Sequence, residues 1–240
     1  GCPWRDLPES RFGPWETVYS RFRKWRSDGT LEKVAAALVE VLDEQGEIDW
    51  DLWCVDGSSA RATRAAAGAA KEGGPADEPA DHGLGRSRGG LTSKFHLVVD
   101  GKGQPLGVVV SAGQRHDSTC FDEAMDSVPL PARFEALPEA KRPPKQTAAD
   151  KAYSSAKIRL RLEAQGVRAV IPRKKNEKTP KGEEFDKEAY KRHNVVERCI
   201  GWLKECRRVA TRYEKLAVNF LAMVRLAMIE RYLRVATRSR

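Results

Sequence analysis

The segment FHLVVDGKGQPLGVVVSA, residues 95–112, decides the fold, because it contains two runs rich in β-branched and apolar residues. The runs 95–100 and 106–112 are separated by GKGQP, a short segment of Gly and Pro residues that favours a turn. Two such runs joined by a short turn predict a β-hairpin. A pair of antiparallel strands therefore lies near the middle of the chain, and the segments on either side must supply the rest of the sheet.

Further strands are predicted upstream and downstream of this hairpin. The segment WDLWCVD (50–56) is a mostly apolar run that ends in an acid, as a buried strand would. Downstream, QTAAD (146–150) and 167–171 are short strand patterns, and the apolar spacing of 154–165 predicts a helix between them. This order of strand, hairpin, helix, strand, helix, strand and helix predicts an α/β fold, a mixed sheet flanked by helices.

The remaining helices are predicted from apolar periodicity. We expect helices over 14–26, 31–42, 190–212 and 215–235, and a helix over 119–127 with its N-cap at Asp117–Ser118. The first two form a small N-terminal helical region. They could belong to a DNA-binding helical module or to an ordinary helical cap, and periodicity alone favours the cap.

Two polar segments are predicted to be loops. Residues 68–90 are rich in Gly, Ala and Pro and end in GLGRSRGG, so we expect a mobile loop that exposes Arg86 and Arg88. Its glycines neither follow a strand nor open a helix, which excludes a phosphate-binding nucleotide fold. Residues 173–187 are expected to form a second, Lys-rich loop.

The charge of the chain indicates a polyanionic partner. The 240 residues contain 43 Lys and Arg against 34 Asp and Glu, a net charge of +9. Residues 190–240 contain 13 basic and 4 acidic residues, so this segment has the same balance as the whole chain. Such a tail favours nucleic acid over a membrane surface. No run approaches the ~18 apolar residues that a membrane span needs.

The cysteines point to neither a metal nor a disulfide framework. Their number, five, is odd, and no two are spaced as a CxxC pair. We expect free thiols in a reducing compartment, the cytoplasm.

The strand order brings particular acids together. If the strands that end in Asp56 and Asp150 are parallel, both acids lie at the same carboxyl edge, where open sheets place their sites. Asp100 falls at the opposite edge of the sheet, whereas His116 and Asp117 fall at the edge of Asp56. Sequence order alone therefore ranks Asp56 and Asp150 above Asp100.

A third acid lies on the polar face of the predicted 190–212 helix. The apolar residues Val195, Cys199, Trp202, Cys206 and Val209 form one buried stripe, with spacings of 4, 3, 4 and 3. The opposite face carries Glu197, Gly201, Lys204 and Arg208. An acid for a metal ion followed by cations for phosphates would use such a line, but so would a surface helix laced with salt bridges. The periodicity leaves both interpretations open.

The three acids suggest metal chemistry. Asp56, Asp150 and Glu197 would offer oxygen ligands, which Mg²⁺ and Mn²⁺ prefer. Two such ions about 4 Å apart stabilise the attacking and the leaving oxygens of phosphoryl transfer. Together with the basic tail, these acids predict a metal-dependent nuclease or strand-transfer enzyme.

Six blocks of the sequence carry a known pattern almost from end to end. They are GCPWRDLPESRFGPWETVYSRFRKW (1–25), VDGSSARA (55–62), GRSRGGLTSKFHLVVDGKGQPLGVVVSAGQRHDS (85–118), ADKAYSS (149–155), VIPRKKN (170–176) and YKRHNVVERCIGWLKECRRVATRYEKLAVNFLAMVRLA (190–227). In this order, the blocks resemble the DDE transposases of bacterial insertion sequences, of the insertion-sequence-five type.

The resemblance implies a fold, an activity and a set of partners. It implies a ribonuclease H-like catalytic domain with C-terminal helices over 47–240, and a DNA-end-binding helical region over 1–46 that is incomplete. Asp56, Asp150 and Glu197 would be the catalytic triad that holds Mg²⁺ or Mn²⁺, as two ions. The enzyme would cut DNA at the terminal inverted repeats of an element and join the ends to target DNA. It would act in the cytoplasm, as a homodimer on DNA and without a membrane partner.

The last motif of that family concerns DNA contacts. The motif is Tyr, two residues, Arg, three residues, Glu, six residues and Lys, and Tyr190, Glu197 and Lys204 fit it. His193 occupies the Arg position and Arg192 precedes it, so either side chain could serve that role. The DNA-binding residues expected from the resemblance and from the helix face are Tyr190, Arg192, His193, Lys204 and Arg208.

Three functions remain open at this point. The intact triad favours an active transposase. The His193 substitution and a start at Gly1 suggest a catalytically dead DNA-binding remnant, and a plain nuclease would cut DNA without joining it. If Lys204, Arg207, Arg208 and Arg212 meet phosphates, DNA affinity should fall steeply between roughly 50 and 200 mM salt.

Overall fold

The fold is built around one long central strand. The computed structural model describes residues 2–67, 82–175, 177 and 185–238. Its seven-stranded sheet consists of β1 (Leu52–Ala62), β2 (Gly85–Ser87), β3 (Gly90–Asp100), β4 (Pro105–Ala112), β5 (Gln146–Ala149), β6 (Arg168–Val170) and β7 (Thr211–Arg212). Most of the first half of β1 is buried, in keeping with its apolar composition.

The pairing of the strands confirms the predicted fold class. β1 pairs antiparallel with β3, which pairs antiparallel with β4. On its other side β1 pairs in parallel with β5, and β5 in parallel with β6. The order β4-β3-β1-β5-β6, in which β3 alone runs against the other four, is the ribonuclease H-like arrangement expected from the motifs.

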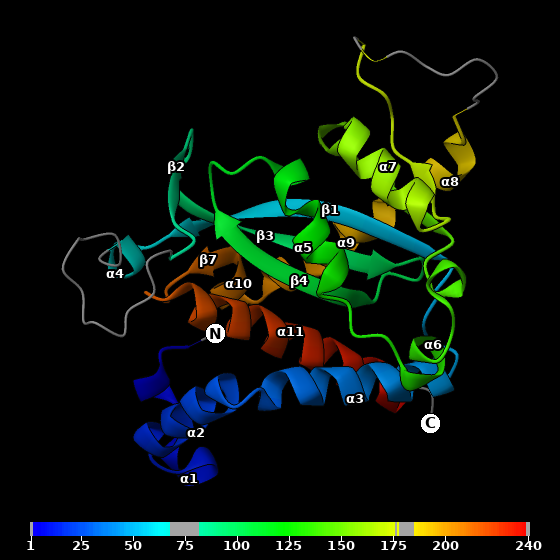
Figure 1. Ribbon diagram of the computed structural model, residues 1–240. Helices are drawn as coiled ribbons and strands as arrows, with labels where there is room; N and C mark the ends of the chain where they lie inside the picture. The colour runs from blue at the N-terminus through cyan, green and yellow to red at the C-terminus, as the bar shows by residue number, and fades with distance from the viewer. Residues whose placement is uncertain (1, 68–81, 176, 178–184, 239–240) are drawn as a thin grey trace.

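The helices cover both faces of this sheet. The α-helices are α1 (Glu9–Phe12), α2 (Trp15–Ser27), α3 (Thr30–Glu44), α4 (Arg64–Ala67), α5 (Phe121–Asp126), α6 (Ala132–Glu135), α7 (Ala156–Ala164), α8 (Lys187–Lys191), α9 (Asn194–Glu205), α10 (Arg207–Ala210) and α11 (Ala217–Arg238). Short 3-10 helices are η1 (Trp4–Asp6), η3 (Asp117–Cys120), η4 (Glu139–Lys141) and η5 (Lys151–Tyr153). α5 lies in front of the sheet and α9 behind it, while α11 runs along β4 with α3 beneath it (Figure 1).

Two predicted segments differ in extent from the structure. The strand predicted to end at Asp56 continues to Ala62, because β3 pairs with it as far as Arg61 and β7 pairs with its last two residues. Part of the predicted 68–90 loop is a hairpin of β2 with the start of β3; the rest, 68–81, lies outside the described residues. Arg86 and Arg88 are exposed, as predicted.

The single helix predicted over 190–212 is wrong. A turn at Arg192 and His193 separates α8 from α9, and the chain leaves the helical conformation at Cys206, whose φ of −72° and ψ of 107° are extended. The fully buried guanidinium of Arg212 supplies the reason, because it donates to the carbonyls of Gly83, Glu214 and Lys215. These bonds require an extended backbone at β7, which replaces the last helical turns.

Two hydrophobic clusters hold the layers together. The larger one joins the strands to α9, α11 and the inner face of α3, from which it takes Val39 and Leu42. The smaller one attaches α2 and α3 to α11 through Phe22, Leu31 and Met223. All five cysteines are free thiols, as predicted.

None of the helices in the described part of the chain is long and apolar enough to cross a membrane.

Candidate active site

Asp56 and Asp150 lie side by side in the sheet. In the parallel pairing of β1 and β5, Val55 is opposite Ala149. Asp56 and Asp150 are the next residues along these two segments, and neighbouring strands are about 4.8 Å apart. The register therefore brings together the two acids that strand order ranked first.

Asp56 sits in a partly buried position. One of its carboxylate oxygens accepts a hydrogen bond from the backbone N–H of Gly57 at 2.7 Å. Burial raises the pKa of Asp56 to about 6. The hydrogen bond from Gly57 and the nearby His193 oppose this rise, whereas the negative charges of Asp150 and Asp117 add to it. The carboxylate is thus costly to ionise unless a positive charge is close to it.

Glu197 comes to the same region from the first turn of α9, where it is exposed. The pKa of the Tyr190 hydroxyl is raised by burial and then by the charges of Asp150, Glu197 and Asp56. The negative charges of all three acids therefore raise the pKa of one hydroxyl group.

The described residues contain no ready-made cluster of three metal-ligating side chains. This finding is compatible with Mg²⁺, which binds through one or two carboxylates and completes its shell with water and substrate phosphate. The oxygen donors at Asp56, Asp150 and Glu197 fit such a hard ion by their chemistry.

The contacts distinguish His193 from Arg192. His193 is buried, its ring stacks on Tyr190 with centroids 5.7 Å apart, and its Nε2 lies 3.2 Å from the Val55 carbonyl oxygen. Arg192 instead donates to Asp49 at 2.5 Å, next to the Asp100 turn at the other edge of the sheet. Of the two side chains, that of His193 contacts the strand of Asp56, whereas Arg192 touches this strand through its carbonyl oxygen, beside Cys54.

Lys204 occupies a gap in the sheet. β5 pairs with β1 only as far as Val55, and β7 begins at Arg61, so the described strands leave this side of 56–60 open. The Nζ of Lys204 donates to the carbonyl oxygen of Ser59 at 3.1 Å. Burial lowers the pKa of Lys204, and the charge of Asp56 opposes this shift. A partly desolvated ammonium therefore stands close to the acids.

The other three basic residues expected to meet phosphates do not share that position. Arg208 forms an ion pair with Glu214 at 2.6 Å, and its guanidinium lies over the Trp4 ring. Arg212 is buried, and Arg207, predicted on a buried helix face, is exposed and donates to the Tyr213 hydroxyl. The helix break at Cys206 separates all three from the face of Glu197 and Lys204.

A polar network beside Asp56 was predicted only in part. Asp117 lies at the edge of Asp56, as strand order predicted, but instead of capping a helix it accepts a hydrogen bond from Lys94 Nζ at 2.9 Å. Its Oδ1 lies 3.7 Å from Nδ1 of His96, whose pKa burial lowers to about 4. A Cβ added to Gly57 would lie 2.7 Å from the same oxygen, so a larger residue there would displace the Asp117 side chain. Lys94 and His96, two polar residues at alternate positions of β3, were the available signal.

Asp100 has a structural role, in agreement with its lower rank. Its two carboxylate oxygens accept hydrogen bonds from the backbone N–H groups of Asp49, Lys102 and Gln104. These bonds close the turn between β3 and β4.

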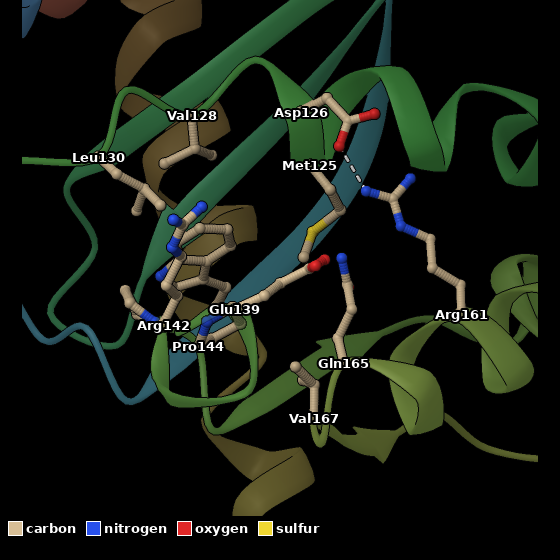
Figure 2. Close-up of a pocket in the computed structure, with 12 residues that line it drawn as sticks. Met125, Asp126, Val128, Leu130, Glu139, Arg142, Pro144, Arg161, Gln165 and Val167 are labelled. Carbon is tan, nitrogen blue, oxygen red and sulfur yellow. Dashed lines mark hydrogen bonds and ion pairs between the residues drawn. The ribbon is translucent and has the colours of Figure 1, made fainter. Parts of the chain in front are cut away.

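A cavity of about 260 Å³ lies elsewhere in the molecule. Figure 2 shows Arg161 of α7 reaching across it toward Asp126 of α5, at 2.5 Å. It is lined by Pro144 and Val167, which precede β5 and β6, and thus lies at the amino ends of these strands. The acids lie at the carboxyl end of β5, so this cavity is not part of their site.

Comparisons with known proteins give two family matches and one curated relative. Residues 51–229 match the family described as "Transposase DDE domain", and residues 1–35 match a family assigned to IS4/5 transposases. A Burkholderia cepacia protein assigned as the transposase for insertion sequence element IS402 is 30% identical over 125 residues, 52% of this chain and 55% of the relative. The chain thus spans about half the length of this relative.

Two solved structures also match. The Mos1 transposase paired-end complex with left transposon end and a pre-cleavage Mos1 transpososome are 11% and 10% identical to the chain. Both alignments cover 100% of this chain, and 74% and 75% of the Mos1 chains, with TM-scores of 0.30 and 0.31. Scores this low do not establish a common fold.

Proposed function

The chain belongs to the DDE transposase family, and we propose that it is a DNA transposase that cuts phosphodiester bonds at the ends of an insertion sequence and transfers the ends to target DNA. The observation that carries this proposal is that Asp56 and Asp150 each follow directly on the last β1–β5 pair, Val55 with Ala149, while the charge of Glu197 acts on the same tyrosine hydroxyl as theirs. Acids from two strands and a helix are thereby directed to one edge of the sheet.

We propose that Asp56, Asp150 and Glu197 hold Mg²⁺ or Mn²⁺, as two ions. When bound, these ions would lower the pKa of a water or of a DNA 3′-hydroxyl and offset the charge that develops on the phosphate. The raised pKa of Asp56 fits this role, because a nearby cation restores its ionised form.

The side chains around the acids would bind and orient the DNA. Lys204 presents a compact, partly desolvated charge that suits a phosphate oxygen next to the reacting bond. The stacked rings of Tyr190 and His193 form a rigid wall beside the acids, and His193 takes the position that the family motif gives to Arg. Of the two alternatives at this position, the contacts favour His193 over Arg192.

The partners are proposed on the same basis. The terminal inverted repeats would bind the helical region 1–46, where α2 exposes the basic side chains Arg21, Arg23 and Lys24. Residues 47–240 would form the catalytic domain. Pairing of two element ends would require a homodimer on DNA, and an enzyme that acts on bacterial DNA works in the cytoplasm.

Substitution of the three acids tests the chemistry. Asp56→Asn, Asp150→Asn and Glu197→Gln should each abolish Mg²⁺-dependent cleavage of duplexes carrying an element end, while DNA binding in a gel shift persists. Asp51→Asn is the matched control, because Asp51 is exposed and pairs with Lys145 at the other end of the β1–β5 pair. Full cleavage by any one of the three variants would remove that residue from the site.

The same assay separates the alternative functions. The absence of a close three-ligand cluster among the described residues and the His193 substitution favour a DNA-binding remnant as the second candidate. Binding of element-end DNA without nicking in Mn²⁺ would support the remnant. Cut ends without joined products would support a plain nuclease.

A further inference from the structure

The β2–β3 hairpin, residues 85–92, is not part of the site described above. Gly85 pairs with Thr92, Arg86 with Leu91, and Ser87 with Gly90, so Arg88 and Gly89 form the tip of a tight turn. Figure 1 shows β2 projecting beyond the end of the sheet. Gly90 has a φ of +95°, a conformation that favours glycine and that this turn requires.

Four exposed arginines belong to this hairpin or to the segment where β1 ends. Arg86 and Arg88 belong to it, Arg61 lies at the end of β1, and Arg64 begins α4. Arg61 is opposite Thr92 in the sheet, and its Nη2 lies 3.8 Å from the position of a Cβ built on Gly89. The guanidinium of Arg61 therefore lies next to the turn of the hairpin.

These arginines form no ion pair or side-chain hydrogen bond within the described part of the chain, although acids are available elsewhere. Several exposed arginines do pair there, such as Arg115 with Glu123 and Arg133 with Asp43. Like charges that have no acid partner among the described residues repel one another, so this arrangement favours an external anion. Arginine suits phosphate in particular, because its planar guanidinium donates two parallel hydrogen bonds.

The hairpin pairs with a more distal part of the strand that carries Asp56. Asp56 and Arg61 are on the same strand, five residues apart, which corresponds to about 17 Å at ~3.3 Å per residue. Lys204, bound to Ser59, lies between them. Because B-DNA rises ~3.4 Å per base pair, this distance spans about five base pairs.

We propose that the β2–β3 hairpin and Arg61 bind the phosphate backbone of duplex DNA about five base pairs from the phosphodiester that reacts. This inference rests on the proposed function, since the reacting phosphodiester is placed at Asp56. The interactions are with phosphates rather than with base edges, so they add affinity and orientation without sequence preference. Glycines at 89 and 90 leave Arg88 as the one large side chain of the turn, so little besides its guanidinium stands between the backbone and the duplex.

The first test is the salt dependence of DNA binding. The double variant Arg86→Ala/Arg88→Ala should reduce the slope of log affinity against log salt by about 2, one unit for each phosphate that the protein no longer neutralises. Between 50 and 200 mM salt, the affinity of the wild type should then fall about 15-fold more than that of the variant. An unchanged slope would overturn the proposal.

A control variant removes the same charge elsewhere. Lys141→Ala/Arg238→Ala takes away two exposed basic residues that form no ion pair within the described chain. Lys141 lies near Asp49 at the amino end of β1, and Arg238 ends α11. This variant should keep the wild-type slope. Arg86→Lys/Arg88→Lys keeps the charge, so it should restore the slope and show that the effect of the alanine variant is not misfolding.

Duplex length locates the hairpin on the DNA. Duplexes that end two base pairs beyond the reacting phosphodiester, on one side or on the other, are compared with a duplex that extends on both sides. Truncation on one side should make the DNA affinities of the wild type and of Arg86→Ala/Arg88→Ala equal. Truncation on the other side should preserve the difference between these affinities. A difference that survives both truncations would overturn the placement.

Metal-free binding separates this inference from the proposed function. All slopes are measured in EDTA, so they do not depend on catalysis. A reduced slope in the hairpin variant together with a wild type that never cleaves DNA would refute the transposase activity and leave the phosphate interaction intact. Normal cleavage together with an unchanged slope would refute the phosphate interaction alone.

Discussion

Aspartate residues have different roles at the two edges of the sheet. Asp56 faces the open gap beside Lys204, whereas Asp100 is fully buried and bound by three backbone N–H groups. Burial raises the pKa of both to about 6. For Asp100, which has no role at the site, this shift predicts an effect on stability alone.

Stability should depend on pH through Asp100. Its folded pKa lies above the ordinary 3.8, so its favourable contribution is complete below about pH 4 and is lost as the pH rises through about 6. Between pH 4 and 7, the wild type should therefore lose up to roughly 3 kcal/mol of unfolding free energy relative to Asp100→Asn. Urea unfolding of both proteins across this range measures the difference. Asp51→Asn, at an exposed position, should show no such trend, and a constant wild-type–Asp100→Asn difference would contradict the prediction.

The residues of the site differ in how far the sequence could predict them. The juxtaposition of Asp56 and Asp150 followed from a general rule, that parallel strands end at one edge of a sheet. Strand order also put Asp117 at this edge, but its contacts with Lys94 and His96 depend on how the segment after β4 folds back over Gly57, and no local pattern encodes this path. Arg208 was misplaced because the helix breaks at Cys206, without the Gly or Pro that would announce a break.

At the scale of elements, periodicity predicted the N-terminal helices but not the breaks within 190–212. The apolar spacing predicted α2 and α3 to within two residues at each end, and the Gly- and Pro-containing turn predicted the β3–β4 hairpin. The length of β1 was not predictable, because its second half is polar and becomes a strand only through pairing with β3 and β7. The length of β1 thus depends on strands that are distant in the sequence, which local composition does not reveal.

The attachment of the N-terminal helices depends on Phe22. This side chain is 4% exposed and packs against Trp4, with ring centroids 5.1 Å apart, in the cluster that reaches α11. Phe22→Ala should lower the free energy of unfolding by about 3–5 kcal/mol, because it leaves a cavity. Phe12→Ala is the control, since Phe12 is 46% exposed and should change stability by only about 0.5 kcal/mol. Urea unfolding curves of the two variants decide the matter, and equal losses of stability would contradict this assignment.

At the scale of the whole molecule, the N-terminal helical region and the sheet share one core. Val39 and Leu42 of α3 belong to the same hydrophobic cluster as the strands, and Asp43 holds Arg133 of α6 at 2.6 Å. The regions 1–46 and 47–240, which we propose to have different functions, are therefore not separate folding units.

This shared core predicts a single cooperative unfolding transition. The six tryptophans report on both regions, because Trp4, Trp15 and Trp25 lie in the N-terminal part and Trp50 and Trp53 in or next to β1. In protein labelled with fluorotryptophan, the native ¹⁹F signals of both groups should disappear at the same urea concentration and with the same slope, since the two halves of one core unfold together. Earlier disappearance of the N-terminal signals would show that α2 and α3 unfold independently. The core packing of Val39 and Leu42 would then contribute too little to couple the DNA-end-binding region to the catalytic sheet.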